Sequence, residues 1–365
     1  MSSVHLFIVQ DYYTWLATDP LCTWLQTFSQ SSHTYVAAFG GRCTPVKPRQ
    51  AAPVIERVNL APIHFHAKKM SERHFWPNDG RSFPTWFYHQ PPAYTVMLHV
   101  LLDAVVMPHG HVVGRGTNDS NVKLTRFSCK ARADTSTTAP DGTSKSAVYG
   151  RVLAAGMISG EAYYHRLMEE MPRVAPYVDF LRRNPDVRIH VSDVENLTIG
   201  TLRALGIPNA ERRAVSGLVR ASIAYVPRFA ECLWPRPVDT QLAARAFRRY
   251  IRSHLLPVVK RDRVVMIRRT RHTRTLNNRD EIEVIVQRAA ADFGLRYSLF
   301  IDNPSPTLEQ TMMMFYEAVL VVAPHGAGLA NIVFSLPGTS VVEVTHRNVF
   351  SSFFPTIIQT TAVLA

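Results

Sequence analysis

The feature that most constrains the fold of this chain is an alternation of apolar runs and helix-forming stretches that begins near residue 260. The short apolar runs are RVVMIRR, RYSLFID, LVVAP and SVVEV. The stretches between them are DEIEVIVQRAAADFGL, SPTLEQTMMMFYEAV and GLANIVFSL, and Asn278 with Glu281 fits the capping box that begins a helix. Such an alternation predicts a parallel sheet covered by helices on both faces.

A second alternation occupies residues 150–255. The runs YGRVLAAGM, VRIHVSD and ASIAYVPR predict strands, and NLTIGTLRALGI and QLAARAFRRYIRSHL predict helices, the first with a C-cap at Gly206. The stretch EAYYHRLMEEMPRVAPYVDFLRRN has apolar residues at helical spacing, and Pro172 and Pro176 predict that it is kinked or divided.

The first part of the chain is harder to interpret. Residues 1–90 contain aromatic clusters among Pro, Ser and Gly, without a long periodic stretch. Residues 91–107 could form a buried pair of strands or one helix, because periodicity does not separate the two. Residues 115–146 are rich in Ser, Thr, Asp and Gly, which predicts an exposed loop.

A chain of 365 residues is too long for one ordinary hydrophobic core, so we expect more than one domain. We expect an N-terminal region over 1–90, an α/β domain over 91–255, a second α/β domain over 256–346, and a C-terminal tail over 347–365.

The chain is basic, and its charge predicts an anionic partner. The net charge is +13, and only seven of the 41 basic residues are Lys. Nucleic acid, an acidic surface or a phosphate-bearing ligand would each fit, as would an arginine-rich surface that only meets solvent.

No apolar run reaches the roughly 18–20 residues of a membrane span. The N-terminal VHLFIV is a poor secretory signal, because it is short and no basic residue precedes it. The sequence therefore predicts either a cytosolic protein or one whose anchor lies upstream of this chain.

A polar, glycine-containing turn follows the predicted strand LVVAP. In an open parallel sheet, ligands bind beyond the carboxyl ends of the strands, and the start of a helix there favours phosphate. We therefore expect a nucleotide or sugar phosphate at the turn, with Glu343 of the next strand accepting from ribose hydroxyls. The residues of the turn are His325, Gly326, Ala327 and Gly328.

Two other interpretations of this turn are open. It could be a tight strand-to-helix connection with no ligand. It could also be the oxyanion loop of a lipase or esterase, but that needs a G-x-S-x-G elbow, and Gly156-Met-Ile-Ser-Gly160 has the wrong spacing.

Three segments, in order, resemble the signatures of glycosyltransferase family 61, the group that includes plant and fungal β-1,2-xylosyltransferases and animal O-linked GlcNAc transferases of the secretory pathway. They are AYYHRLMEEMPRV (162–174), VVMIRRTRHTRTLNNRDEI (264–282) and APHGAGLANIVFSLPGTSVVEV (323–344). Ala162, Arg166 and Arg279 stand where the family usually has Asn, Trp and Glu, and the tail after residue 346 is shorter than in the family.

The resemblance implies the B-type glycosyltransferase architecture, in which two Rossmann-like domains face each other across a cleft. It implies an inverting transfer of xylose or GlcNAc from a UDP-sugar to a glycan or glycoprotein hydroxyl, in the Golgi or ER lumen. The UDP-sugar is a co-substrate, and no cofactor or metal is expected, because arginines and a helix N-terminus can neutralise the diphosphate.

An inverting transfer needs a base for the acceptor hydroxyl. His165 and Glu169 are four residues apart and would share a helix face. We expect Glu169 to be the base, with His165 positioning the acceptor or acting as the alternative base. A surface Arg166–Glu170 pair beside a histidine that is already hydrogen-bonded is the other interpretation of this segment.

Arginines follow the strand RVVMIRR at the end where a ligand would bind, and guanidinium groups make bidentate contacts with phosphate. The resemblance matches two of them, Arg269 and Arg274, to family arginines. The expected nucleotide-sugar-binding residues are Arg268, Arg269, Arg274, His325, Gly326, Ala327, Gly328, Asn331 and Glu343.

Two alternatives to an active transferase remain. One is a nucleic-acid-binding protein that uses RRTRHTR and the arginine-rich stretch 244–252. The other is a degenerate relative that binds a sugar nucleotide without turnover.

Overall fold

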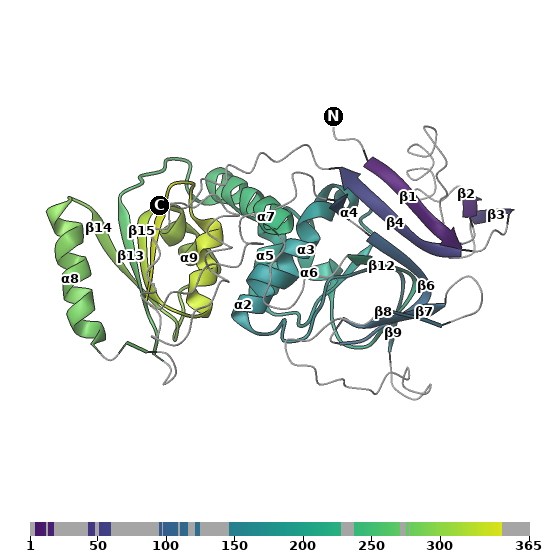
Figure 1. Cartoon of the computed structure of the whole chain (residues 1–365), viewed down its shortest axis with the longest axis horizontal. Helices are drawn as coiled ribbons and strands as arrows, with labels where there is room; N and C mark the ends of the chain where they lie inside the picture. Colours follow the sequence, from purple (N-terminus) through teal and green to yellow (C-terminus); the bar gives the residue numbers. More distant parts are fainter. Residues whose placement is uncertain are drawn as a thin grey trace, which may run out of the picture. The chain divides into compact units, whose positions relative to one another are not determined.

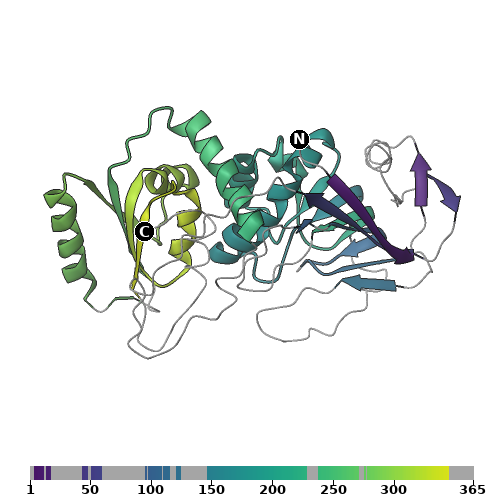
Figure 2. The ribbon, with the colours of Figure 1, turned by 45° about the horizontal axis from the view of Figure 1, so that its top comes forward.

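The computed structural model describes residues 4–11, 14–17, 43–47, 51–59, 95–96, 98–108, 110–115, 121–124, 146–227, 237–270, 275–276 and 278–344; side chains are described within 100–108, 110–114, 146–227, 239–270, 275–276 and 278–344. These residues belong to two compact units, which are divided after Tyr250 (Figures 1 and 2). The expected tail over 347–365 lies outside the described residues.

The first unit is built on a 10-stranded mixed sheet whose main path is β1-β4-β6-β12-β9-β10-β11, with β5, β7 and β8 paired beside it. Its strands, with the separate pair β2 and β3, are β1 (Val4–Asp11), β2 (Thr14–Ala17), β3 (Cys43–Lys47), β4 (Ala51–Asn59), β5 (Thr95–Val96), β6 (Leu98–Val106), β7 (Val112–Arg115), β8 (Asn121–Leu124), β9 (Ala147–Ala154), β10 (Arg188–His190), β11 (Ala214–Val215) and β12 (Val219–Pro227).

The part of this sheet that matches the expected α/β pattern is β12-β9-β10-β11, in which every pair is parallel. The chain runs from β9 to β10 and β11 on one side, and then returns to β12 on the other side of β9. The order therefore reverses between β9 and β12, and such a switch point is where open α/β sheets bind ligands.

The rest of the sheet differs from the Rossmann-like domain that we expected over 91–255. Strand β6 pairs antiparallel with β12, and β7 and β8 extend the antiparallel part. The ambiguous residues 91–107 thus contribute strands, not a helix. Strands β1 to β4 also lie in the first 90 residues, where the sequence showed no period.

The helical segments of the first unit confirm the sequence pattern. The prolines divide the 161–184 stretch as expected, and Gly206 ends α5 with a left-handed φ of 94°. The segments are α2 (Tyr163–His165), the π-helix η3 (Arg166–Glu170), α3 (Met171–Val174), the 3-10 helix η4 (Ala175–Tyr177), α4 (Val178–Arg183), α5 (Asn196–Leu205), α6 (Ala210–Arg213) and α7 (Pro237–Tyr250), with α3 and α5 packed against α7.

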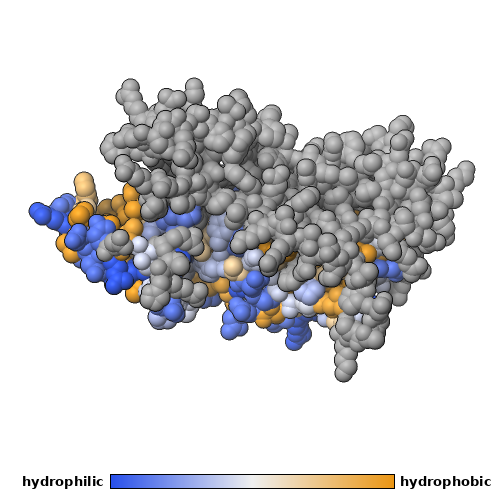
Figure 3. All heavy atoms as spheres, turned by 60° about the horizontal axis from the view of Figure 1, so that its bottom comes forward, coloured by the Kyte–Doolittle hydropathy of each residue, from blue (hydrophilic) through white to orange (hydrophobic). Residues whose placement is uncertain are grey.

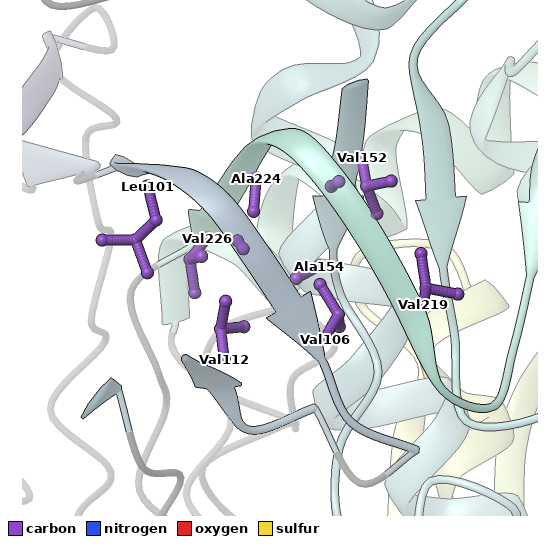
Figure 4. Close-up of a cluster of buried hydrophobic side chains, with 10 residues drawn as sticks. Leu101, Val106, Val112, Val152, Ala154, Val219, Ala224 and Val226 are labelled. Atoms are coloured by element: carbon purple, nitrogen blue, oxygen red, sulfur yellow. The ribbon is translucent and has the colours of Figure 1, made fainter. Parts of the chain in front are cut away.

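A cluster of small aliphatic side chains forms part of the core of the first unit, and it lies between the parallel and antiparallel parts of the sheet (Figure 4). Val106 and Val112 come from β6 and β7, while Val152, Val219 and Val226 come from β9 and β12. Branched side chains fit a pleated sheet, and each fully buried one contributes about 1.5–3 kcal/mol. This cluster joins the antiparallel strands to the strand that precedes His165.

The second unit confirms the parallel sheet that the C-terminal alternation predicts. Its strand order is β14-β13-β15-β16, with every pair parallel. Helix α8 packs on β13 and β14, and α9 packs with η6 on the opposite face of the sheet (Figures 1 and 2). The elements are the π-helix η5 (Ile251–Leu255), β13 (Arg263–Arg268), α8 (Arg279–Asp292), β14 (Arg296–Ile301), α9 (Leu308–Tyr316), β15 (Ala318–Pro324), the 3-10 helix η6 (Ala327–Phe334) and β16 (Ser340–Val344).

The strand order of the second unit also reverses, between β13 and β15. The chain goes from β13 to β14 on one side, and then crosses to β15 and β16 on the other side. The turn after β15 and the loop after β13 therefore begin at neighbouring strand ends, at the edge where a ligand is expected.

Local details of the helices correct the sequence analysis. Asn278 stands at the N-cap of α8, but its side chain caps no backbone group, so the predicted capping box is wrong. A capping box that we did not predict joins Thr307 and Gln310 at the start of α9. The stretch after the His325 turn is a 3-10 helix.

Helix α8 exposes much of its surface. Only Ala290 is fully buried among its residues, while Val284 and Ile285 are 62% and 66% exposed. Apolar and charged side chains adjoin at this end of the molecule, the left end of Figure 3. No helix in the part of the chain that the structure describes is both long and apolar enough to cross a membrane.

Candidate active site

The loop after β13 and the turn after β15 meet through Arg269. Its Nη1 atom donates a hydrogen bond to the carbonyl oxygen of His325, 3.2 Å away. Strands β13 and β15 are paired neighbours, so both segments leave the sheet at the same edge. The structure thus brings Arg269 together with His325 and Gly326, which lie more than fifty residues later in the sequence.

Gly326 is the residue of the turn on which the arginine lies. Its φ of 152° belongs to the region that side chains rarely adopt, and a Cβ in ideal geometry would lie 1.6 Å from Nη1 of Arg269. Any larger residue would therefore collide with the guanidinium as well as strain the backbone.

His325 is held at both its backbone and its ring. The backbone N–H donates to the carbonyl oxygen of Val344 at 2.9 Å, and Nδ1 lies 2.6 Å from Oε1 of Glu343. Both side chains are 13% exposed. Glu343, which we expected to bind ribose, therefore uses one carboxylate oxygen to orient the imidazole, an arrangement typical of histidines with a defined tautomer.

The remaining turn residues have structural contacts. Asn331 is fully buried and donates its amide N–H to the carbonyl oxygen of Gly328 at 2.9 Å. Ala327 begins the 3-10 helix η6, and the first backbone N–H groups of a helix lack intrahelical partners. Asn331 therefore holds the turn through its hydrogen bond to Gly328. The N–H groups at the start of η6 are suited to an anion.

Arg268 differs from its neighbour Arg269. Its guanidinium forms ion pairs with Asp280, at 2.8 Å, and with Glu283, both on α8. These carboxylates neutralise Arg268 and fix α8 against the end of β13. Arg274 lies outside the described residues.

Asp302 is a residue of this edge that sequence reasoning missed. Its Oδ1 accepts hydrogen bonds from the backbone N–H and the hydroxyl of Thr270, both at 2.8 Å. The carboxylate thereby holds the loop that begins with Arg269. An acidic residue directly after a predicted strand was the available signal.

In the first unit, His165 and Glu169 form a hydrogen-bonded pair, with 3.0 Å between Nδ1 and Oε2. They lie on the helical segment that follows β9 in the chain. The Glu169 side chain is 0% exposed and the His165 side chain 17%. The imidazole is therefore the more accessible group of the pair, and the carboxylate is enclosed.

Glu169 lies in η3, where the chain adopts five residues of π-helix. Such segments are rare and often occur at functional sites. Tyr164 is also close: its ring makes an edge contact with that of His165, and burial, with the charge of Glu169 second, raises the pKa of the tyrosine well above its ordinary value.

Glu170 corrects the interpretation of this segment as a surface pair. Its side chain is fully buried, and Oε1 accepts from the backbone N–H of Ser192 at 2.6 Å and from its hydroxyl at 2.7 Å. Burial raises the pKa of Glu170 to about 7, against the opposing effects of Ser192, Arg166 and Arg173.

Arg166 is buried as well, and it does not pair with Glu170. Its guanidinium forms ion pairs with Asp193 and with Glu195, the latter at 3.1 Å, and donates to the carbonyl oxygens of Gly160 and Glu161. The arginine that replaces the usual family tryptophan thus has its own carboxylates, supplied by the chain after β10.

Among the residues that the structure describes, no group of three or more His, Cys, Asp or Glu side chains could hold a metal ion.

Comparison with known proteins supports one family. Residues 163–342 match the sequence model described as glycosyltransferase 61. The match begins two residues before His165 and includes the loop of Arg269 and the His325 turn, so it contains the candidate residues of both units. No curated protein matches the chain. The match over residues 163–342 supports membership of this chain in glycosyltransferase family 61, a family of sugar-transferring enzymes.

Proposed function

We propose that this protein is an inverting glycosyltransferase that moves a sugar from a UDP-sugar to a hydroxyl of a glycan or glycoprotein. The observation that carries the proposal is the contact of Arg269 with the His325–Gly326 backbone at the switch point of a parallel sheet. A guanidinium beside a helix start suits the diphosphate of a sugar nucleotide.

On the donor side, we assign the leaving diphosphate to Arg269 and to the backbone N–H groups at the start of η6. Arg268 is left out because Asp280 and Glu283 already neutralise it. Glu343 is assigned to His325 instead of ribose, because its Oε1 is hydrogen-bonded to the imidazole. His325 then presents its ring to the phosphate or the sugar.

On the acceptor side, the different exposure of the His165 and Glu169 side chains changes which of them we assign as the base. A base must come within about 2.6–3.2 Å of the proton that it removes. Glu169 is buried behind His165, so we assign the base to Nε2 of His165 and the orientation of the ring to Glu169. An ionised carboxylate only accepts hydrogen bonds, so Nδ1–H donates to it and Nε2 keeps a lone pair.

The transfer then proceeds as one displacement at the anomeric carbon. His165 takes the proton of the acceptor hydroxyl while the oxygen forms its bond to the carbon. The bond from that carbon to the diphosphate breaks, its electron pair leaves with UDP, and attack from the opposite face inverts the configuration. Arg269 stabilises the charge that develops on the leaving group, so the transfer requires no divalent metal.

The donor sugars that we propose are xylose and GlcNAc, which rest on the family alone, as does the B-type architecture.

The adjacent arginines provide a matched test. We expect UDP to raise the melting temperature of the wild-type protein, with or without EDTA. A hydrogen bond to a charged group contributes about 1.5–3 kcal/mol, so Arg269→Ala should weaken UDP binding roughly 10- to 150-fold. Arg268→Ala, one residue away, should change it only a few-fold. Calorimetric titration with UDP measures both.

Three results would contradict the donor assignment: stabilisation by GDP or ADP but not UDP, a shift that requires Mn²⁺, or equal UDP affinities of the wild type and Arg269→Ala.

A further inference from the structure

The two glycines of the His325 turn face different surroundings. A Cβ at Gly328 would meet Ile267 Cγ2 at 3.0 Å and Phe300 at 3.9 Å, which are apolar side chains of the sheet. For a Cβ at Gly326, the three nearest heavy atoms would instead all belong to the guanidinium of Arg269, with Nη1 at 1.6 Å, Cζ at 2.9 Å and Nε at 3.6 Å.

The guanidinium thus occupies the space that a side chain at position 326 would take. The same Nη1 atom donates to the carbonyl oxygen of His325, the residue before this glycine. We infer that Gly326 is a positioning residue for Arg269. Because Gly326 has no side chain, it leaves a space, called the seat below, in which the guanidinium lies and faces the leaving group. This inference rests on the proposed function for the identity of the ligand.

This role of Gly326 differs from the usual role of a glycine at a phosphate-binding turn, which is to let the ligand approach the backbone closely. Here the group that approaches closely is the protein's own cation. Nη1 is the far end of a flexible side chain, so its displacement by a methyl group at position 326 costs little, and the strain of the φ of 152° is a separate cost to folding. Substitution should therefore act on the ligand through Arg269.

The first experiment needs no ligand. Crystal structures of the wild type and Gly326→Ala would show whether the methyl group removes the guanidinium from the His325 carbonyl, as we expect. Calorimetric titrations with UDP and with inorganic pyrophosphate would then compare Gly326→Ala, Arg269→Ala and the double variant. Each single variant should bind roughly 10- to 150-fold more weakly.

The double variant should bind no more than a few-fold more weakly than Arg269→Ala, because both changes remove the same contact. Gly328→Ala is the matched control. It contacts the apolar core, so any loss of affinity that it causes should multiply with the loss in Arg269→Ala. Lysine at position 269 gives a rescue test, because its ammonium takes the place of Cζ, 2.9 Å from the methyl group. The alanine should weaken binding less in the Arg269→Lys background.

The backbone angle at Gly326 could by itself prevent Gly326→Ala from folding. If Gly326→Ala folds only when it is combined with Arg269→Ala, the positioning role of Gly326 is supported. If it folds in neither background, backbone strain explains the glycine and the inference is overturned. A guanidinium that stays on the His325 carbonyl, or losses that multiply in the double variant, would also overturn it. If the wild type binds neither UDP nor pyrophosphate, the proposed function fails, while the crystal structures still decide the seat.

Discussion

At the scale of single residues, His165 of the first unit and His325 of the second share one arrangement. His165 and His325 each direct Nδ1 at a glutamate, at 3.0 Å and 2.6 Å respectively. A carboxylate in this position fixes the tautomer and stabilises a positive charge on the ring. The difference lies in their surroundings, since His325 adjoins Arg269, whereas His165 lies beside buried carboxyl groups. We therefore expect an anion to bind at His325 and proton transfer to occur at His165.

The acid–base assignment is tested with two variants of the His165–Glu169 pair. His165→Ala should lower kcat at least the roughly 10²-fold typical of a general base, and leave the Kd for UDP within a few-fold. Glu169→Gln keeps a hydrogen-bonding group on Nδ1, so its kcat should fall less. Steady-state kinetics with a UDP-sugar and calorimetry of UDP would measure these effects. If Glu169→Gln removes turnover while His165→Ala retains it, the base is Glu169.

At the scale of elements, buried charged side chains hold the π-helix η3 to the chain that follows β10. Glu170 hydrogen bonds to Ser192, and Arg166 pairs with Asp193 and Glu195. A Cβ at Gly160 would lie 2.0 Å from the Ser192 hydroxyl, so that glycine lets the serine reach the carboxylate. The position of His165 and Glu169 thus depends on polar contacts made by their helical neighbours.

The buried carboxyl of Glu170 gives this region a pH dependence. Its folded pKa of about 7 lies above the ordinary value of 4.5, so the folded protein retains a proton that the unfolded chain releases between those values. The free energy of unfolding should therefore fall as pH rises from 4.5 to 7, by about 3 kcal/mol from this group.

Glu170→Gln removes this titration, so its stability relative to the wild type should increase over the same pH interval and level off above 7. Urea unfolding at several pH values measures the difference, with Glu211→Gln on the exposed surface of α6 as the control. A difference that does not change with pH would show that the buried carboxyl does not titrate in this interval.

At the scale of the whole molecule, the net charge of +13 does not by itself indicate a binding surface. Many of the described arginines already have partners within the chain: Arg151 pairs with Asp186, Arg263 and Arg296 pair with Glu317, and Arg213 donates to the backbone carbonyls of Leu181, Asn184 and Val187. Arg268, the first residue of RRTRHTR, is neutralised by α8.

This use of arginine separates the transferase from the nucleic-acid alternative. We expect the protein to bind duplex and single-stranded oligonucleotides no better than the non-specific level, a Kd of about 10⁻⁴–10⁻⁶ M at physiological salt. A gel-shift titration over increasing salt measures it, with UDP added as competitor. Nanomolar binding with a steep salt dependence, unaffected by UDP, would favour the nucleic-acid interpretation.

The sequence by itself determined the second unit most fully. Its strands and helices follow apolar periodicity, and each is local, so the parallel sheet and the position of the His325 turn could be predicted. The same holds for the divided helix around Pro172 and the cap at Gly206. The family motifs also indicated His165, Glu169, Arg269 and the turn before any contact was known.

Only the tertiary structure decided how those residues are used. Whether residues 91–107 form strands depended on pairing with β12, which is distant in the sequence. The neighbouring arginines look alike in the sequence, yet one meets the carboxylates of α8 and the other rests on Gly326. Burial of Glu169 and Glu170, and the pairing of Glu343 with His325, likewise arise from side-chain contacts between elements. Local propensity selects an element, whereas the environment of a charge is set by what the fold packs against it.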